Sequence, residues 1–267
     1  MNKLERLNPC KAKIIGAKYL TNGGSTANRR VIHLDIGLPY LFPKGSNTSP
    51  RRDSFNNLIP SLTYTPGDAI GIVCPNEAGK VSWLIKRLKL LSQADKFFEV
   101  KRLNQMGISK RALRQANKMN RIPAKHRTPR LALTHHVDLS GPIRRSTIKK
   151  FAVFCSAQSD RLQMEKLGSI DGRAEYTMLI ENQKVGLAEL LAMFPSCEPP
   201  LDSILNVMPS LMPRYYSVAS SPIEDPFVIS IAFTVLEYEI NVAKYGNNPS
   251  WRRSDGQLED AMVTSKR

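Results

Sequence analysis

The chain has 267 residues, 42% of them hydrophobic, so it is long enough for one large domain or two small ones with ordinary cores. Its cysteines lie far apart and form no CxxC pair, which argues against a zinc site and a disulfide framework: Cys10, Cys74, Cys155 and Cys197. The charged N-terminal segment lacks the apolar core of a signal peptide, and no run of about 18 apolar residues occurs. We therefore expect a soluble, cytoplasmic protein.

The net charge of +16 is concentrated in one segment. Residues 101–130 contain ten Lys or Arg and no acidic residue, and such a block attracts polyanions. A solvated insertion is the simplest interpretation, and docking of an acidic protein is the alternative. Nucleic acid is the least favoured partner, because the segment has neither interleaved aromatic residues nor a nucleic-acid-binding motif.

Two strands are expected within residues 9–38, separated by a polar turn at residues 22–25. In the second strand, residues 30–36 (RVIHLDI) alternate with the period of two that is typical of a half-buried strand. Residues 44–58 are rich in turn formers and predict a loop. Pro66-Gly67-Asp68 then predicts a tight turn that leads into an apolar strand at residues 69–74.

The hydrophobic period changes after residue 75. Apolar residues at spacings of three and four predict an amphipathic helix whose face consists of Val81, Leu84, Leu88 and Leu91. After the basic segment, residues 131–143 (LALTHHVDLSGPI) predict a short strand and a turn. From residue 143 to about residue 206, apolar residues recur at helical spacing.

Strands return after residue 210, in MPRYYSVASS and FVISIAFTVLEYEI, which are rich in β-branched and aromatic residues. The order of strands, helices and strands predicts an α+β fold, in which an antiparallel β-barrel is interrupted by an all-helical insertion. The chain contains neither GxGxxG nor GxxxxGK(S/T), so the dinucleotide and P-loop fingerprints are absent.

Residues 213–221 (PRYYSVASS) carry the most specific chemistry. A flavin dinucleotide needs a guanidinium for its pyrophosphate, an aromatic ring to stack on its isoalloxazine and a hydroxyl near N5. Arg214, Tyr216 and Ser217 supply these three groups. In an extended strand Arg214 and Tyr216 project to one side and Ser217 to the other, so a kink or a change of twist is needed for all three to reach one ligand.

The string RYYSVASS resembles the RxYS signature of the ferredoxin-reductase-like FAD-binding proteins, and in particular of the diflavin reductases built like cytochrome P450 reductase. Further segments resemble that family in the same order: PGDAIGIVCPN, LTHHVDLSGPIRRSTIKKFA and LLAMFPSCEPPLDSILNVMPSLMPRYYS. Within the family, FPSCEPPL is most similar to the branch that reactivates cobalamin-dependent methionine synthase. The resemblance implies an NADPH-dependent flavoprotein oxidoreductase, in which electrons pass from NADPH to FAD, to FMN and on to cob(II)alamin of methionine synthase.

The resemblance also implies roles for single residues. Arg214 would pair with the FAD pyrophosphate, Tyr216 would stack on the isoalloxazine and Ser217 would hydrogen-bond near N5. The strand at residues 232–234 would line the flavin. Arg29 would lie near the nicotinamide nucleotide phosphates, with an exposed edge-strand arginine as the alternative. No catalytic or metal-binding residue is expected, and the full cofactor-binding set is Arg29, Arg214, Tyr215, Tyr216, Ser217, Ala232, Phe233, Thr234 and Tyr238.

We expect residues 8–75 to form the first part of the FAD-binding barrel, residues 76–206 the helical connecting subdomain and residues 207–240 the second part of the barrel. Residues 241–267 are polar and resemble nothing in the family. This sequence has no counterpart of the family's FMN module, NADPH module or GxCTxWL element. Because the GxCTxWL element holds the FAD pyrophosphate in the family, the sequence predicts weak FAD binding. The alternative is a non-catalytic module that docks an acidic partner.

Overall fold

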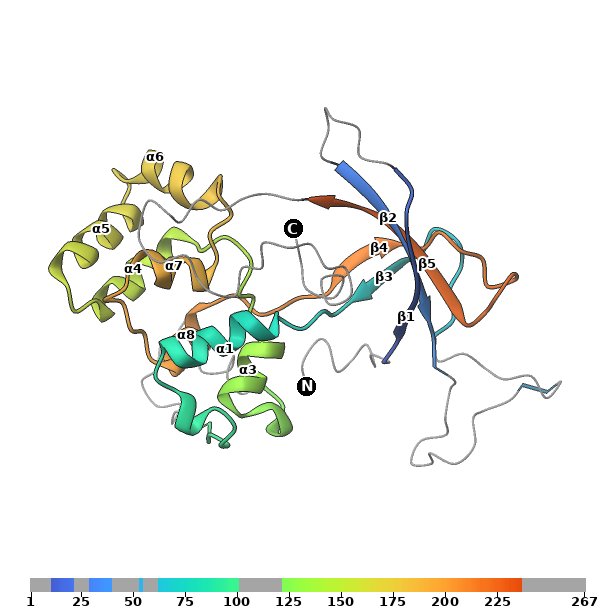
Figure 1. The fold of residues 1–267 in the computed structure, drawn as a ribbon, viewed down its shortest axis with the longest axis horizontal. Helices are drawn as coiled ribbons and strands as arrows, with labels where there is room; N and C mark the ends of the chain where they lie inside the picture. The colour runs from blue at the N-terminus through green and yellow to red at the C-terminus, as the bar shows by residue number, and fades with distance from the viewer. Residues whose placement is uncertain (1–10, 22–28, 40–52, 55–61, 101–121, 237–267) are drawn as a thin grey trace, which may run out of the picture. The chain divides into compact units, whose positions relative to one another are not determined.

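The computed structural model describes residues 11–21, 29–39, 53–54, 62–100 and 122–236. These residues divide into two compact units, which can be followed by colour along the chain in Figure 1. The sheet unit comprises the described residues up to Val73 together with those from Pro213 onward, and the helical unit comprises the described residues between them. The helical unit is therefore inserted into the sequence of the sheet unit.

Three strands of the sheet unit form an antiparallel sheet in the order β1-β2-β5, with bounds β1 Lys13–Tyr19, β2 Arg29–Gly37 and β5 Val228–Leu236. The alternation predicted for β2 is confirmed, because Ile32 and Leu34 are each only 5% exposed. Phe233 and Ile231 of β5 lie opposite them in the antiparallel register and share their face. This face carries the apolar core of the sheet unit.

The second sheet pairs β3 (Ala69–Ile72) with β4 (Arg214–Ser217), again antiparallel. Both this pair and the β2–β5 pair join segments from the two sides of the helical insertion (Figure 1). Within the described residues neither sheet closes into a barrel. The fold is therefore a mixture of helices and antiparallel sheets, and the closed barrel stays a prediction.

The helical unit is built around one continuous apolar core, to which its helices contribute side chains. No helix in the described part of the chain is both long enough and apolar enough to cross a bilayer. The α-helices are α1 Ala78–Arg87, α3 Pro129–His135, α4 Arg145–Phe151, α5 Gln158–Gly168, α6 Arg173–Tyr176, α7 Leu187–Met193 and α8 Leu201–Val207. Shorter helical segments are η2 Leu91–Gln93, η3 Ala124–His126, η4 Ala152–Phe154 and the π-helical η5 Thr177–Glu181.

Helix α1 ends earlier than the sequence pattern predicts. The predicted apolar face is buried at Leu84, but Lys89 adopts the left-handed conformation with a φ of 58°, which stops the helix. The N–H of Leu90 donates to Ile85 O at 2.9 Å, as in a Schellman helix end. The prediction that Leu91 belongs to the helix face is wrong, since Leu91 is 65% exposed in the separate segment η2.

Residues 129–135 form helix α3, so the strand predicted from LALTHHVDL is wrong. Pro129 occupies the first helical position, where its fixed φ and missing N–H are tolerated. The hydroxyl of Thr128 caps the helix by accepting the N–H of Leu131 at 3.3 Å. Beyond α3, Val137 forms only an isolated bridge with Ser210 and is not part of a strand.

Candidate functional site

Strand β4 carries the residues that the sequence singles out, and it pairs with β3 without a register shift. Arg214 and Tyr216 are half-buried on one face of the strand, whereas Tyr215 and Ser217 are exposed on the other. The structure therefore brings Arg214 and Tyr216 together. The four residues run as regular strand, so the side chain of Ser217 points away from that pair.

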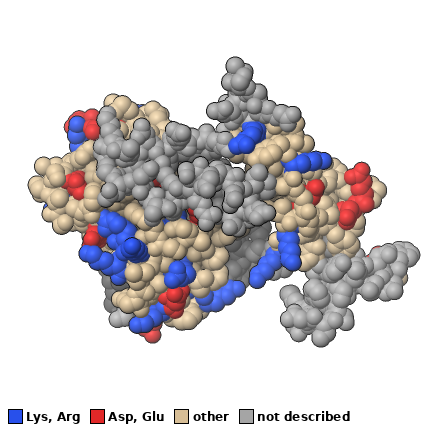
Figure 2. Space-filling model, viewed as in Figure 1, with Lys and Arg blue, Asp and Glu red and all other residues tan. Residues whose placement is uncertain are grey.

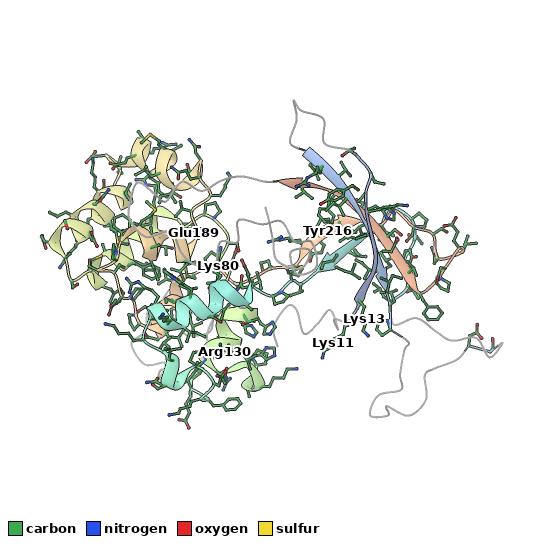
Figure 3. The ribbon with its side chains drawn as sticks, viewed as in Figure 1. Lys11, Lys13, Lys80, Arg130, Glu189 and Tyr216 are labelled. Atoms are coloured by element: carbon green, nitrogen blue, oxygen red, sulfur yellow. The ribbon has the colours of Figure 1, made fainter. Side chains whose placement is uncertain are left out.

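The ring of Tyr216, which is labelled on β4 in Figure 3, contacts the ring of Phe233 on β5. Its centroid lies 5.4 Å from that of Phe233 and the two rings are tilted by 50°, a geometry that aromatic pairs favour. Phe233 lies opposite Ile32 on the apolar face of the three-stranded sheet. Tyr216 is thus held in place by a residue that the sequence assigns to the same site.

The turn at Pro66-Gly67-Asp68 fixes the end of β4. Gly67 has a φ of +88°, and the N–H of Asp68 donates to Thr65 O at 3.1 Å, which is the pattern of a type II turn. The carbonyl of Asp68 accepts the N–H of Val218 at 2.7 Å, and the N–H of Gly67 donates to Val218 O at 3.1 Å. These two hydrogen bonds tie the turn to the residue that directly follows β4, so the predicted turn is confirmed and positions the site.

Tyr64 is a residue of this region that the sequence reasoning missed. It is 7% exposed, and its hydroxyl donates to Val228 O at 2.7 Å and lies 3.1 Å from Ser220 Oγ. Ser220 Oγ in turn accepts the N–H of Ser230 at 2.9 Å. Tyr64 therefore fixes the loop between β4 and β5. Its signal in the sequence is its place in LTYTPGD, directly before the turn, because a buried tyrosine hydroxyl usually has a partner.

The other residues of the predicted cofactor set lie apart from Arg214 and Tyr216 or outside the described residues. Ala232 and Thr234 are exposed, on the face of β5 opposite to Phe233, whose ring contacts Tyr216. The backbone of Arg29 begins β2, but its side chain is outside the described residues. Tyr238 lies outside them altogether.

Arg214 and Tyr216 offer a permanent positive charge and a flat ring on one face of a single strand. Two residues of a strand span about 6.8 Å, a distance that a short carbon chain can bridge. Among the residues that the structure describes, Arg214 forms no ion pair, so its guanidinium can meet an anionic ligand. The arrangement fits a ligand in which a phosphate is tethered to an aromatic ring system.

Other kinds of site find less support in the structure. In the described ranges, no group of three or more His, Cys, Asp and Glu side chains is arranged to hold a metal ion. Most of the basic segment, residues 101–121, lies outside the described residues, so docking of an acidic partner there stays a prediction. Figure 2 shows that Lys and Arg side chains also gather elsewhere on the helical unit.

Comparison with known proteins places the chain among flavoproteins. A family profile described as FAD binding domain matches residues 53–251, so the match extends past Ile240, where the motif resemblance ends.

The chain is 29% identical over 183 residues to methionine synthase reductase of Bos taurus, covering 68% of this chain and 26% of that protein. It is 30% identical over 196 residues to nitric oxide synthase of Bombyx mori, covering 73% of this chain and 16% of the relative. It is 30% identical over 181 residues to NADPH–cytochrome P450 reductase of Cavia porcellus, covering 67% of this chain and 25% of that protein. The chain therefore spans about a quarter or less of the length of these relatives.

Proposed function

This chain belongs to the FAD binding domain family found in the diflavin oxidoreductases, and on that premise we propose that Arg214 and Tyr216 hold the FAD of an NADPH-dependent electron-transfer enzyme. The cofactor of the family is FAD. The observation that carries the proposal is the position of the guanidinium and the aromatic ring on one face of β4.

In this proposal each side chain has a distinct task. Arg214 binds the pyrophosphate, because a guanidinium stays charged and presents several fixed donors to phosphate oxygens. Tyr216 stacks on the isoalloxazine, with its ring held by Phe233. The two-residue step along β4 suits the short ribityl chain between ring and phosphates. When bound, FAD supplies the conversion of a two-electron hydride from NADPH into two single-electron transfers.

The role of Ser217 depends on which end of β4 the flavin ring occupies. The next residue, Val218, keeps its hydrogen bonds to the turn before β3 and also forms a bridge with Ile231 of β5. A residue that pairs with two segments is a place where the strand can twist, and such a twist is needed for Ser217 to approach N5. We therefore place the ring at this end of β4 and the phosphates at Arg214.

Within the family we propose the methionine synthase reductase branch. The chain would then belong to a path from NADPH through FAD and FMN to cob(II)alamin of methionine synthase, in methionine biosynthesis, with methionine synthase and an FMN domain as partners. The similarity to the Bos taurus enzyme and the segment FPSCEPPL support this choice. A cytoplasmic location is part of the same proposal.

Reconstitution of the purified chain with FAD tests the site, with quenching of flavin fluorescence as the measurement. Arg214→Ala removes charge-assisted hydrogen bonds worth about 1.5–3 kcal/mol, so the Kd for FAD should rise about tenfold to hundredfold. Tyr216→Ala removes a stacking contact worth about 0.5–1.5 kcal/mol, so we expect a rise of several-fold. Both variants keep the backbone pairing of β4 with β3.

Two matched variants serve as controls. Arg173→Ala removes an exposed arginine on α6, and Tyr19→Ala removes a tyrosine ring on β1 that is 37% exposed. Both should bind FAD as the parent chain does. An equal loss of affinity in the controls would contradict the assignment of Arg214 and Tyr216. A parent chain that gives no quenching would instead favour the non-catalytic docking module.

A further inference from the structure

Two cysteines that are far apart in the sequence face each other in the helical unit. Cys155 directly follows η4, Cys197 lies in the loop between α7 and α8, and the two form an antiparallel bridge. On one side of the bridge the N–H of Ser156 donates to Ser196 O at 3.1 Å, and a second backbone hydrogen bond of the same length lies on the other side. Because these hydrogen bonds flank the cysteines, the two residues are a non-hydrogen-bonded pair.

The geometry of such a pair is compatible with a disulfide. In a non-hydrogen-bonded antiparallel pair the Cα atoms lie about 4.5 Å apart, and the side chains approach closely. Disulfides span Cα separations of about 4.4–6.8 Å. Cys155 and Cys197 are both free thiols. An S–S bond between them therefore requires rotation of the side chains and little movement of the backbone.

The two thiols differ in their access to reagents. Cys155 is half-buried and its thiol lies 3.3 Å from Met164 Sδ, whereas Cys197 is fully buried and donates to Phe151 O at 3.5 Å. Burial raises the pKa of both thiols, and the neighbouring Cys155 raises the pKa of Cys197 further. Cys155 is therefore the group that meets an oxidant first, and its reaction is slow at neutral pH because little thiolate is present.

We propose that Cys155 and Cys197 form a reversible disulfide, which links the segment before α5 to the loop after α7, when a small-molecule disulfide such as oxidised glutathione is present. The thiolate of Cys155 attacks one sulfur of oxidised glutathione, forms a mixed disulfide and releases one glutathione thiolate. The thiolate of Cys197 then attacks the sulfur of Cys155 and releases the second. The two cysteines together lose two protons and two electrons. Glutathione disulfide takes up these protons and electrons as it is reduced to two thiols.

The disulfide closes a loop that contains α5, α6 and α7. A link across such a long loop constrains the unfolded chain, so oxidation should raise the Tm of the chain by several degrees. Both cysteines belong to the helical unit, whereas the proposed FAD residues belong to the sheet unit. The Kd for FAD should therefore be the same in the oxidised and reduced chains, and the outcome does not depend on the proposed function.

The test treats the full chain with oxidised glutathione, blocks the remaining thiols by alkylation and maps the peptides by mass spectrometry. We expect a peptide that joins Cys155 to Cys197 and that disappears on treatment with dithiothreitol. Cys197→Ser should stop at a glutathione adduct on Cys155, because no second thiol is present to resolve it. Cys74→Ser is the matched control and should form the link as the parent does. The rate of link formation should rise about tenfold from pH 7 to pH 8, in step with the thiolate fraction.

Three results would overturn the proposal. The first is a map in which Cys10 or Cys74 takes the place of either cysteine in the link. The second is a glutathione adduct on Cys155 that persists in the parent chain, and the third is the absence of any link. If Cys197→Ser does not fold, the peptide map of the parent and its change in Tm decide the question without it.

Discussion

We predict that removing the carboxylate of Glu189 destabilises the helical unit by about 3–5 kcal/mol. Lys80 Nζ on α1 lies 3.0 Å from Glu189 Oε1 on α7, and the two side chains are only 13% and 4% exposed (Figure 3). The other carboxylate oxygen accepts the N–H of Gly186 at 3.1 Å. Glu189→Leu therefore leaves a buried ammonium group and a backbone N–H without their acceptor.

The magnitude follows from how little water reaches the pair. An exposed ion pair contributes about 0–1 kcal/mol, because water solvates the charge that is left behind. Around Lys80 and Glu189 that compensation is largely absent. Lys80→Met leaves the carboxylate with the Gly186 N–H as a donor, so we expect a smaller loss of about 2–3 kcal/mol. The double variant contains two apolar side chains in contact and should lose about 1 kcal/mol, mainly from the missing hydrogen bond to Gly186.

Urea unfolding of the parent, both single variants and the double variant, followed by circular dichroism, gives the coupling between the two side chains. The double variant should be more stable than Glu189→Leu alone. As a matched control, Glu175→Leu breaks an ion pair with Lys166, whose side chain is 62% exposed, and should cost far less stability than Glu189→Leu. If the two single losses simply add in the double variant, or if Glu189→Leu costs no more than the control, the reasoning from burial is refuted.

Two further predictions concern polar groups of the helical unit. Burial lowers the pKa of His126 and His135, so the unfolded chain takes up protons at a higher pH than the folded chain does. The stability that depends on their neutral rings is present above the histidine pKa of the unfolded chain, about 6.5, and is lost as the pH falls. The urea midpoint should therefore drop between pH 7.5 and pH 5.5, and His126→Gln should reduce that drop. Asn76→Ala removes the Nδ2 donor that bonds Leu133 O and Val137 O at 2.6 Å each, and should cost about 2–4 kcal/mol in urea unfolding. A cost below about 1 kcal/mol would show that these carbonyls find other donors.

The sheet unit is predictable where its signals are local. The alternation of RVIHLDI predicts β2, and Pro66-Gly67 predicts the turn, because each depends on the conformational preferences of a few adjacent residues. Helix α3 overlaps the strand expected from LALTHHVDL, because the apolar residues of this short segment also fit a period of two. The signal that identifies it, Thr128 followed by Pro129, is a helix start and outweighs the alternation.

For the candidate site, the sequence supplies the identities of Arg214 and Tyr216 but not their surroundings. Alternation along a strand predicts that these two side chains share a face, and the structure places them so. The contact of Tyr216 with Phe233 and the support from Tyr64 depend on pairing across the helical insertion, which no local pattern encodes. Such contacts between distant segments become visible only once the register of β4 and β5 is known.

The pairing of early strands with late ones also affects how the chain is made. β2 and β3 leave the ribosome well before β5 and β4, their partners. Roughly 140 residues separate Ile72 from Arg214, and at about 5–20 residues per second their synthesis takes on the order of ten seconds. The helical unit, whose core side chains come from residues 81–208, is complete within that interval and can fold first. The nascent chain meanwhile exposes unpaired, apolar strand edges, which makes it a client for chaperones that bind such edges.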